Sequence, residues 1–280
     1  MLAGLFDKRF RPRYHLPVLS TLIRPLRRVA LTAFYRGRRV YCPCCERTFR
    51  SFPHLHCPHC ASHPRHRLLW LYFRLRWADL FHQPLRVLHF APEHCLQQQF
   101  QRMNHLQYIT VDLAEPGVSV HMDMTHLSFP DASMDVILCS HVLEHIADDR
   151  LAMRECQRVL RPGGVAFMQI PQCNEMEKTY EDPSVTTPLE RERHFGQWDH
   201  VRRYGRDFSE RLAEAGFDVT PELFGEELAA SQGPEVLERF GLWHDRIYVC
   251  RKSGEPVAAQ EERGAERKRM EYRFIDSLIH

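Results

Sequence analysis

The sequence lacks any apolar run that approaches the about 20 residues needed for a membrane-spanning helix. It also lacks the pattern of a cleaved secretion signal, because basic residues recur through its first forty positions without a clean apolar core. We therefore expect a cytoplasmic protein. At 280 residues and 44% hydrophobic composition, the chain is long enough for one large core and a small accessory module.

Glycine is missing from the loop after the first expected strand, residues 86–90. The sequence there is His89-Phe-Ala-Pro-Glu-His94, with a carboxylate and a proline in place of a glycine-rich turn. A bound pyrophosphate requires free backbone N–H groups and no negative neighbour, and Pro92 removes one N–H and fixes φ. The loop therefore argues against NAD or FAD as the ligand.

Acidic residues lie at the ends of the next expected strands, where they could bind a nucleoside. Residues 108–112 and 135–139 are two further apolar strands, and the first of them ends on Asp112. In an open parallel sheet, an acid at the end of the second strand is placed to bind a ribose diol. Asp112 lies nineteen residues after Glu93, close to the usual gap of about 20. S-adenosylmethionine suits this acidic site because it has an ammonium and a sulfonium but no phosphate.

The most specific stretch runs from Met122 to Ile146 and is continued by Arg158-Val-Leu-Arg-Pro-Gly-Gly164. With these residues, the chain between positions 85 and 250 resembles a class I S-adenosylmethionine-dependent methyltransferase of the type 11-like group. The resemblance implies an α/β, Rossmann-like, doubly wound fold with a mostly parallel seven-stranded sheet and helices on both faces. It also implies a closing antiparallel strand over residues 246–250 at the sheet edge.

The same resemblance implies roles for residues around the cofactor. Asp112 would hold the ribose hydroxyls, Asp123 would pair with the adenine amino group, and the backbone of Met124 would meet a ring nitrogen. The remaining cofactor-binding candidates lie in the loops after the first and third strands: His89, Ala91, Glu93, Ser140 and His141. Because the loop lacks glycine, the alternative is a binding or regulatory protein that keeps the fold without turnover.

Four of the ten cysteines form a metal-binding pattern. Cys42-x2-Cys45 and Cys57-x2-Cys60 are paired knuckles whose thiolates can meet one structural zinc. Cys44 and the histidines at 54, 56, 59 and 63 are rival ligands. Because Cys44 is adjacent to Cys45, its side chain should point away from the metal. The other cysteines fit reduced, buried positions: residues 44, 95, 139, 156, 173 and 250.

The catalytic candidates lie in the polar stretch from His194 to Gly205. A subgroup of zinc-ribbon methyltransferases has a similar insert, which looks like a lid over the methyl acceptor. Transfer to a hydroxyl or an amine requires proton removal, so His194 and His200 are candidate bases, with Asp199 to orient either of them. Arg202 or Arg203 could hold an anionic acceptor. A second candidate group is His141, Glu144 and His145, which more often begins a helix lining the cofactor. A plain surface loop is the alternative reading.

Positive charge is concentrated in the N-terminal part of the chain. Residues 1–80 contain sixteen Lys or Arg against three Asp or Glu, a balance of +13, whereas the whole chain carries +2. Residues 16–35 form a basic amphipathic pattern, interrupted near Pro25, that fits RNA, an anionic membrane surface or packing on the protein's own domain. A location peripheral to a membrane is therefore also open. The acceptor could be RNA, a glycan or lipid intermediate, or a small metabolite.

These patterns predict four regions. They are a basic amphipathic segment (1–40), a zinc ribbon (41–64), a methyltransferase domain (65–252) and a charged tail (253–280). Within the domain we expect helices over residues 65–80, 142–160 and 209–215. The linker between ribbon and sheet, residues 81–85, is so short that the two modules should pack rigidly.

Overall fold

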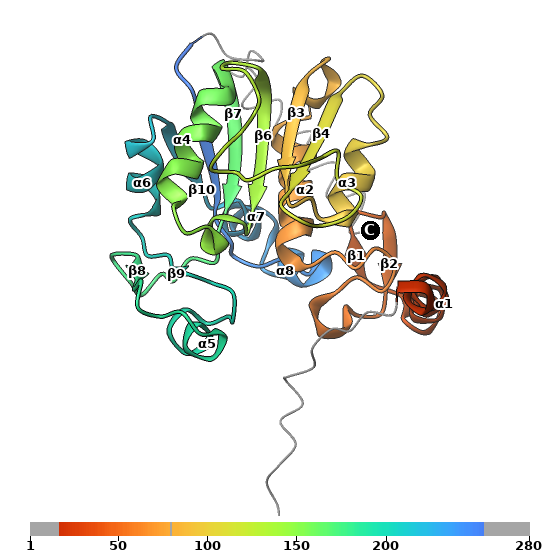
Figure 1. The fold of residues 1–280 in the computed structure, drawn as a ribbon. Helices are drawn as coiled ribbons and strands as arrows, with labels where there is room; N and C mark the ends of the chain where they lie inside the picture. The colour runs from red at the N-terminus through yellow and green to blue at the C-terminus, as the bar shows by residue number, and fades with distance from the viewer. Residues whose placement is uncertain (1–16, 79, 255–280) are drawn as a thin grey trace, which may run out of the picture.

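The computed structural model describes residues 17–78 and 80–254. At its centre is a mixed seven-stranded sheet with the order β10-β11-β7-β6-β3-β4-β5 (Figure 1). The strands are β3 (Arg86–Phe90), β4 (Gln107–Asp112), β5 (Val120–His121), β6 (Met134–Ser140), β7 (Leu160–Gln169), β10 (Asp218–Glu222) and β11 (Ile247–Arg251). The three strands expected from apolar runs are confirmed. The closing strand β11 is antiparallel as expected, but it lies between β7 and β10 rather than at the edge.

Side chains alternate across the central strands and bury both faces of the sheet, which is the pattern of a doubly wound sheet. Val87, Val136 and Phe167 point into one core, formed with helices α2 (Pro64–Arg76), α3 (His94–Phe100), α7 (Phe224–Gln232) and α8 (Glu235–Phe240). Leu88, Ile137 and Met168 point into the other, formed with α4 (Asp149–Val159) and α6 (Phe208–Glu214). The expected fold, with helices on both faces, is therefore confirmed.

Two expected helix boundaries are wrong. The helix expected from residue 142 begins only at Asp149, after a short 3-10 turn (Leu143–His145). Asp148 sets this start because its carboxylate accepts a hydrogen bond from the Leu151 N–H, as an N-cap does. The helix expected to be interrupted near Pro25 is instead continuous as α1 (Pro17–Phe34).

The ribbon consists of the hairpin β1 (Arg36–Cys42) and β2 (Arg47–Phe49), the 3-10 turn Pro53–Leu55 and the loop before α2. Arg67, whose side chain is fully buried, connects the ribbon to the domain. The Arg67 guanidinium donates hydrogen bonds to backbone oxygens of Leu55 and Ser62 in the ribbon and of Phe240 and Gly241 after α8. Ribbon and sheet also share one hydrophobic core, which confirms the expected rigid packing.

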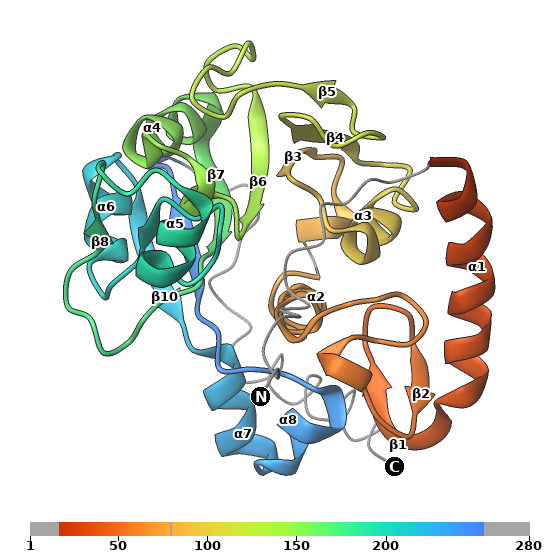
Figure 2. The ribbon, with the colours of Figure 1, turned by 60° about the horizontal axis from the view of Figure 1, so that its bottom comes forward.

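An insert follows β7 and contains β8 (Tyr180–Glu181), α5 (Pro188–Phe195) and β9 (Arg202–Arg203). Figures 1 and 2 show the insert on one side of the carboxyl ends of β6 and β7 and the ribbon with α1 on the other. Among the described residues, no helix has the length and apolar character required to cross a bilayer. The expected charged tail lies almost entirely outside the described residues.

Candidate functional site

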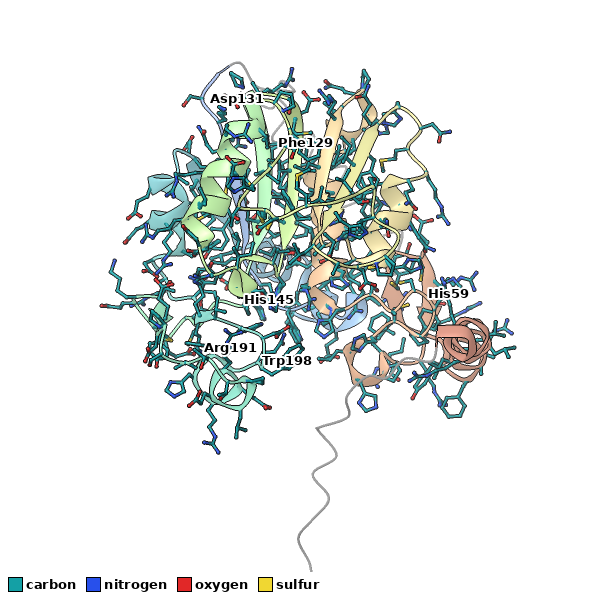
Figure 3. The ribbon with its side chains drawn as sticks, in the orientation of Figure 1. His59, Phe129, Asp131, His145, Arg191 and Trp198 are labelled. Atoms are coloured by element: carbon teal, nitrogen blue, oxygen red, sulfur yellow. The ribbon has the colours of Figure 1, made fainter. Side chains whose placement is uncertain are left out.

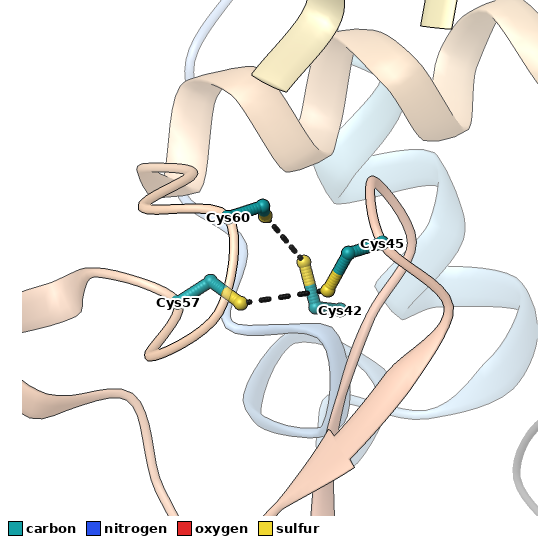
Figure 4. Close-up of side chains that lie close together, drawn as sticks. All are labelled: Cys42, Cys45, Cys57 and Cys60. Atoms are coloured by element: carbon teal, nitrogen blue, oxygen red, sulfur yellow. Dashed lines mark hydrogen bonds between the residues drawn. The ribbon is translucent and has the colours of Figure 1, made fainter. Parts of the chain in front are cut away.

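The four ribbon cysteines meet at one point (Figure 4). The Sγ atoms of Cys42 and Cys60 lie 3.6 Å apart, as do those of Cys45 and Cys57, and all four atoms lie within 4.8 Å of one another. Sulfur ligands about 2.3 Å from a tetrahedral zinc would lie about 3.8 Å apart, so the set fits this metal. The Ser62 hydroxyl lies 3.2 Å from the Cys42 sulfur and can donate to a thiolate there.

Three of the rival ligands, Cys44, His56 and His59, have other partners. The Cys44 sulfur lies 3.7 Å from the backbone oxygen of His66, and burial raises the pKa of this thiol. His59 faces α1, where its Nε2 lies 3.2 Å from an Arg28 guanidinium nitrogen, and His56 Nδ1 bonds the backbone of His54. The expectation that Cys44 turns away from the cluster is thus confirmed. The other five cysteines outside the cluster are also buried thiols, as expected.

The loop after β3 turns without a glycine. Ala91 adopts a φ of 43°, a conformation that favours glycine, and its N–H donates to the Val111 oxygen of β4. His89 lies beneath this loop, fully buried, with Nδ1 2.8 Å from the Tyr108 hydroxyl and Nε2 3.2 Å from Glu93 Oε2. Both ring nitrogens are therefore engaged by the protein, and His89 supports the loop rather than presenting a free nitrogen to a ligand.

Glu93 also lies close to a second histidine, His66, from the helix that follows the ribbon. His66 Nε2 lies 3.5 Å from Glu93 Oε1, and the His63 N–H donates to His66 Nδ1, which assigns the ring proton to Nε2. Burial lowers the pKa of His66 to about 3. Burial alone would raise the pKa of Glu93, but the hydrogen bond from His89 and the two histidines lower it to about 2. The loop therefore carries a fixed negative charge at neutral pH.

The two acids after β4 and β5 are both held in turns. Asp112 Oδ1 accepts hydrogen bonds from the N–H groups of Ala114 and Glu115, each at 2.8 Å. Asp123 Oδ1 accepts from both the backbone and the hydroxyl of Thr125, and these bonds lower the pKa of Asp123. A carboxylate held by such hydrogen bonds keeps a fixed direction.

Buried polar atoms without a protein partner gather after β6. Ser140 donates from its hydroxyl to Gln169 at the end of β7, and the His141 N–H donates to the Gln169 backbone oxygen. His141 Nε2, Glu144 Oε2 and Gln169 Nε2 are buried with no hydrogen-bond partner in the protein. Buried polar atoms are nearly always satisfied, so these three indicate that a polar ligand belongs at the carboxyl ends of β6 and β7.

Beyond these atoms the insert completes an acid and histidine cluster. Ligand atoms of Glu144, His145 and His200 lie within 4.8 Å of one another, and Glu144 is only 1% exposed. Burial lowers the pKa of His200, so its ring is neutral at physiological pH. Such a cluster can accept a proton or hold a divalent cation. In Figure 3, His145 lies at the carboxyl end of the sheet, with Arg191 and Trp198 of the insert below it.

The other expected catalytic residues are separated by the structure. His194 is exposed on α5, where its Nδ1 lies 2.7 Å from the Tyr180 hydroxyl. Asp199 Oδ2 lies 3.4 Å from His145 Nδ1, so it orients a histidine other than the two expected. In the sequence, the signal for the contact between Asp199 and His145 is the Glu144-His145 pair directly after the β6 strand. Such a pair more often marks the start of a helix.

Arg202 cannot hold an anionic acceptor, contrary to expectation. Its guanidinium is buried and donates to the backbone oxygens of three residues, Leu143, Ile146 and Ala147, and to the Glu181 carboxylate. Arg202 therefore fastens the insert to the turn that carries Glu144 and His145. Its neighbour Arg203 is exposed and remains the candidate for an anionic acceptor.

Comparison with known proteins agrees with this geometry. Residues 93–168 match a family model described as a methyltransferase domain. A Mycolicibacterium smegmatis protein named a probable S-adenosylmethionine-dependent methyltransferase is 35% identical over 39% of this chain and 38% of its own length. A human thiol S-methyltransferase is 42% identical over 27% of this chain and 28% of its own.

The matches thus span only 38% and 28% of the length of these two curated relatives. Among solved structures, an S-adenosylmethionine-dependent methyltransferase from Archaeoglobus fulgidus has 18% identity and a TM-score of 0.44, over 66% of this chain and 94% of that one. The antiparallel direction of β11 agrees with the expected one, although its place inside the sheet does not. Over residues 93–168, the match to a methyltransferase domain makes the chain similar to the S-adenosylmethionine-dependent methyltransferases.

Proposed function

We propose that the protein transfers the methyl group of S-adenosylmethionine to an acceptor bound between the sheet edge and the insert. The observation that carries this proposal is the set of fixed carboxylates at the ends of β3, β4 and β5, together with unsatisfied buried polar atoms at the ends of β6 and β7. When bound, S-adenosylmethionine supplies an electrophilic methyl group on a cationic sulfur. The acidic loop suits that cation better than it suits a phosphate.

The cofactor residues that we propose follow the strand ends. Asp112 would bind the ribose hydroxyls, Asp123 the adenine amino group, and the Met124 backbone a ring nitrogen. The Glu93 carboxylate, held by His66 and His89, would supply negative potential near the cationic end. Ala91, Ser140 and His141 would line the remaining contacts.

For the acceptor we propose a protic nucleophile, a hydroxyl or an amine, whose proton passes to His200. The lowered pKa of His200 supports this role because the neutral ring accepts a proton at physiological pH. The Glu144 and Asp199 carboxylates would stabilise the positive charge that develops on the ring. His194 is a weaker candidate because its Nδ1 is engaged with the Tyr180 hydroxyl. RNA, a glycan or lipid intermediate and a small metabolite all offer such nucleophiles.

We also propose that the four cysteines bind one structural zinc. Four thiolates fill a tetrahedral site and leave no position for a catalytic water. The cluster precedes α2, whose first turn supplies His66 to Glu93. The metal would therefore stabilise the segment that orders the cofactor loop.

Equilibrium dialysis with labelled S-adenosylmethionine tests the cofactor assignment. The change Asp112→Ala should weaken binding about tenfold or more, because a charge-assisted bond to the ribose is lost. Glu115→Ala is the matched control, since this nearby exposed acid should be replaceable without effect. Unchanged binding by the Asp112 variant would refute the assignment. Label transfer to any component of a cell extract separates an enzyme from a binding protein without turnover.

A further inference from the structure

Helix α1 packs against the ribbon through polar side chains. The Arg28 guanidinium bonds His59, and the Thr32 hydroxyl lies 3.5 Å from the Pro58 backbone oxygen and 3.4 Å from His59 Nδ1. Figure 3 shows His59 on this side of the molecule, beside α1. A helix that docks on its own protein normally buries its apolar face. Here the side chains that bond the ribbon, Arg28 and Thr32, are polar, and Leu31 is only half-buried.

The opposite side of α1 is apolar and faces solvent. Leu26 is 71% exposed, Val29 67% and Phe34 65%, and Ala30 and Ala33 are exposed as well. At 3.6 residues per turn, these positions fall on one side of the helix. Large aliphatic side chains gathered on an exposed helix face indicate an interaction surface rather than isolated surface residues.

Arginines surround this apolar face. Between residues 26 and 50 the sequence contains seven arginines and one acid, Glu46. Six of these arginines are exposed: residues 27, 36, 38, 39, 47 and 50. The Arg50 guanidinium lies 4.4 Å over the Phe34 ring, which places a positive charge at the border of the apolar side chains. The surface therefore combines aliphatic groups with a strong positive potential.

We propose that the exposed face of α1, with the arginines of β1 and β2, binds the surface of a bilayer that contains anionic lipids. Aliphatic side chains can enter the acyl boundary while arginines meet the headgroups, and interfacial helices are recognised by this combination. RNA would use the arginines but leave Leu26 and Val29 without a partner, and its usual stacking aromatics are represented here only by Phe34. Charge and apolar exposure together thus favour a membrane over RNA.

The position of α1 is compatible with this role. Figure 2 shows the helix along the outer side of the ribbon, with the ribbon between it and α2. A membrane on this face would leave the carboxyl ends of the central strands uncovered. Binding would hold the protein at the surface without blocking its candidate site.

Co-sedimentation of the full chain with vesicles tests the proposal. The protein should sediment with phosphatidylglycerol–phosphatidylcholine vesicles and much less with phosphatidylcholine alone. The double change Leu26→Ser and Val29→Ser should lower the partition coefficient about tenfold or more, because two aliphatic groups leave the acyl boundary. Leu189→Ser, an exposed leucine on α5, is the matched control and should sediment as the unchanged protein does.

Three results would overturn the proposal. One is the absence of sedimentation with anionic vesicles. Another is equal sedimentation of the double variant and the unchanged protein. The third is an RNA mobility shift that depends on the arginines while vesicles are ignored. Binding of S-adenosylmethionine by the double variant should equal that of the unchanged protein, so a failure of the cofactor assignment would be visible separately.

Discussion

The cysteine cluster and the Glu144–His145–His200 cluster are both compact groups of possible metal ligands, but they are assembled differently. The four cysteines come from two short knuckles within one hairpin and its following loop. The second cluster joins a turn after β6 to the insert, and 54 residues separate His145 from its partner Asp199. The first is therefore assembled by local geometry, whereas the second depends on the buried Arg202.

The largest effect should follow from loss of a ribbon cysteine. The change Cys57→Ser should abolish the binding of about one zinc per chain and unfold the ribbon, because structural zinc sites contribute folding free energy directly. Metal analysis and thermal unfolding of the purified protein measure both. Cys44→Ala is the control, since this buried thiol lies outside the cluster and its variant should keep the metal. Zinc retained by the Cys57 variant but lost from the Cys44 variant would reverse our ligand assignment.

Removal of Arg202 should have the next largest effect. Arg202→Ala removes the side-chain donor to three buried backbone oxygens, while Glu181 keeps Arg211 as a donor, so the variant should lose about 1 to 3 kcal/mol of stability. Arg203→Ala, at the exposed neighbouring position, should stay within about 0.5 kcal/mol. Urea unfolding of both variants provides the comparison. Equal destabilisation would mean that the insert is not fastened through Arg202.

Substitution of His200 should affect rate more than stability. His200→Gln should lower methyl transfer to an extract acceptor about 100-fold or more while S-adenosylmethionine still binds. His194→Gln should have little effect. Because burial lowers the pKa of His200, the rate should rise as pH increases through a value below that of an ordinary histidine and then stay level through neutral pH. Activity that requires an added divalent cation, while the zinc content stays at about one per chain, would instead assign His200 as a metal ligand.

The same contrast explains what the sequence predicts well. Knuckle spacing and strand periodicity are local, so the four-cysteine cluster and the three apolar strands follow from them. The start of α4 depends on the Asp148 cap, and the role of Arg202 depends on carbonyl groups far away in sequence. The sequence favours His194 over His145 as the catalytic base, because only the folded insert brings His145 next to His200. Pattern cannot reveal contacts that the fold alone creates.

A crystal structure of the protein with S-adenosylhomocysteine tests the central claim most directly. We expect the ribose hydroxyls at Asp112, the adenine beside Asp123 and Met124, and the homocysteine end near the loop that carries Glu93. An empty site after soaking, or a phosphate-bearing nucleotide at these strand ends in its place, would contradict the proposed methyltransferase function.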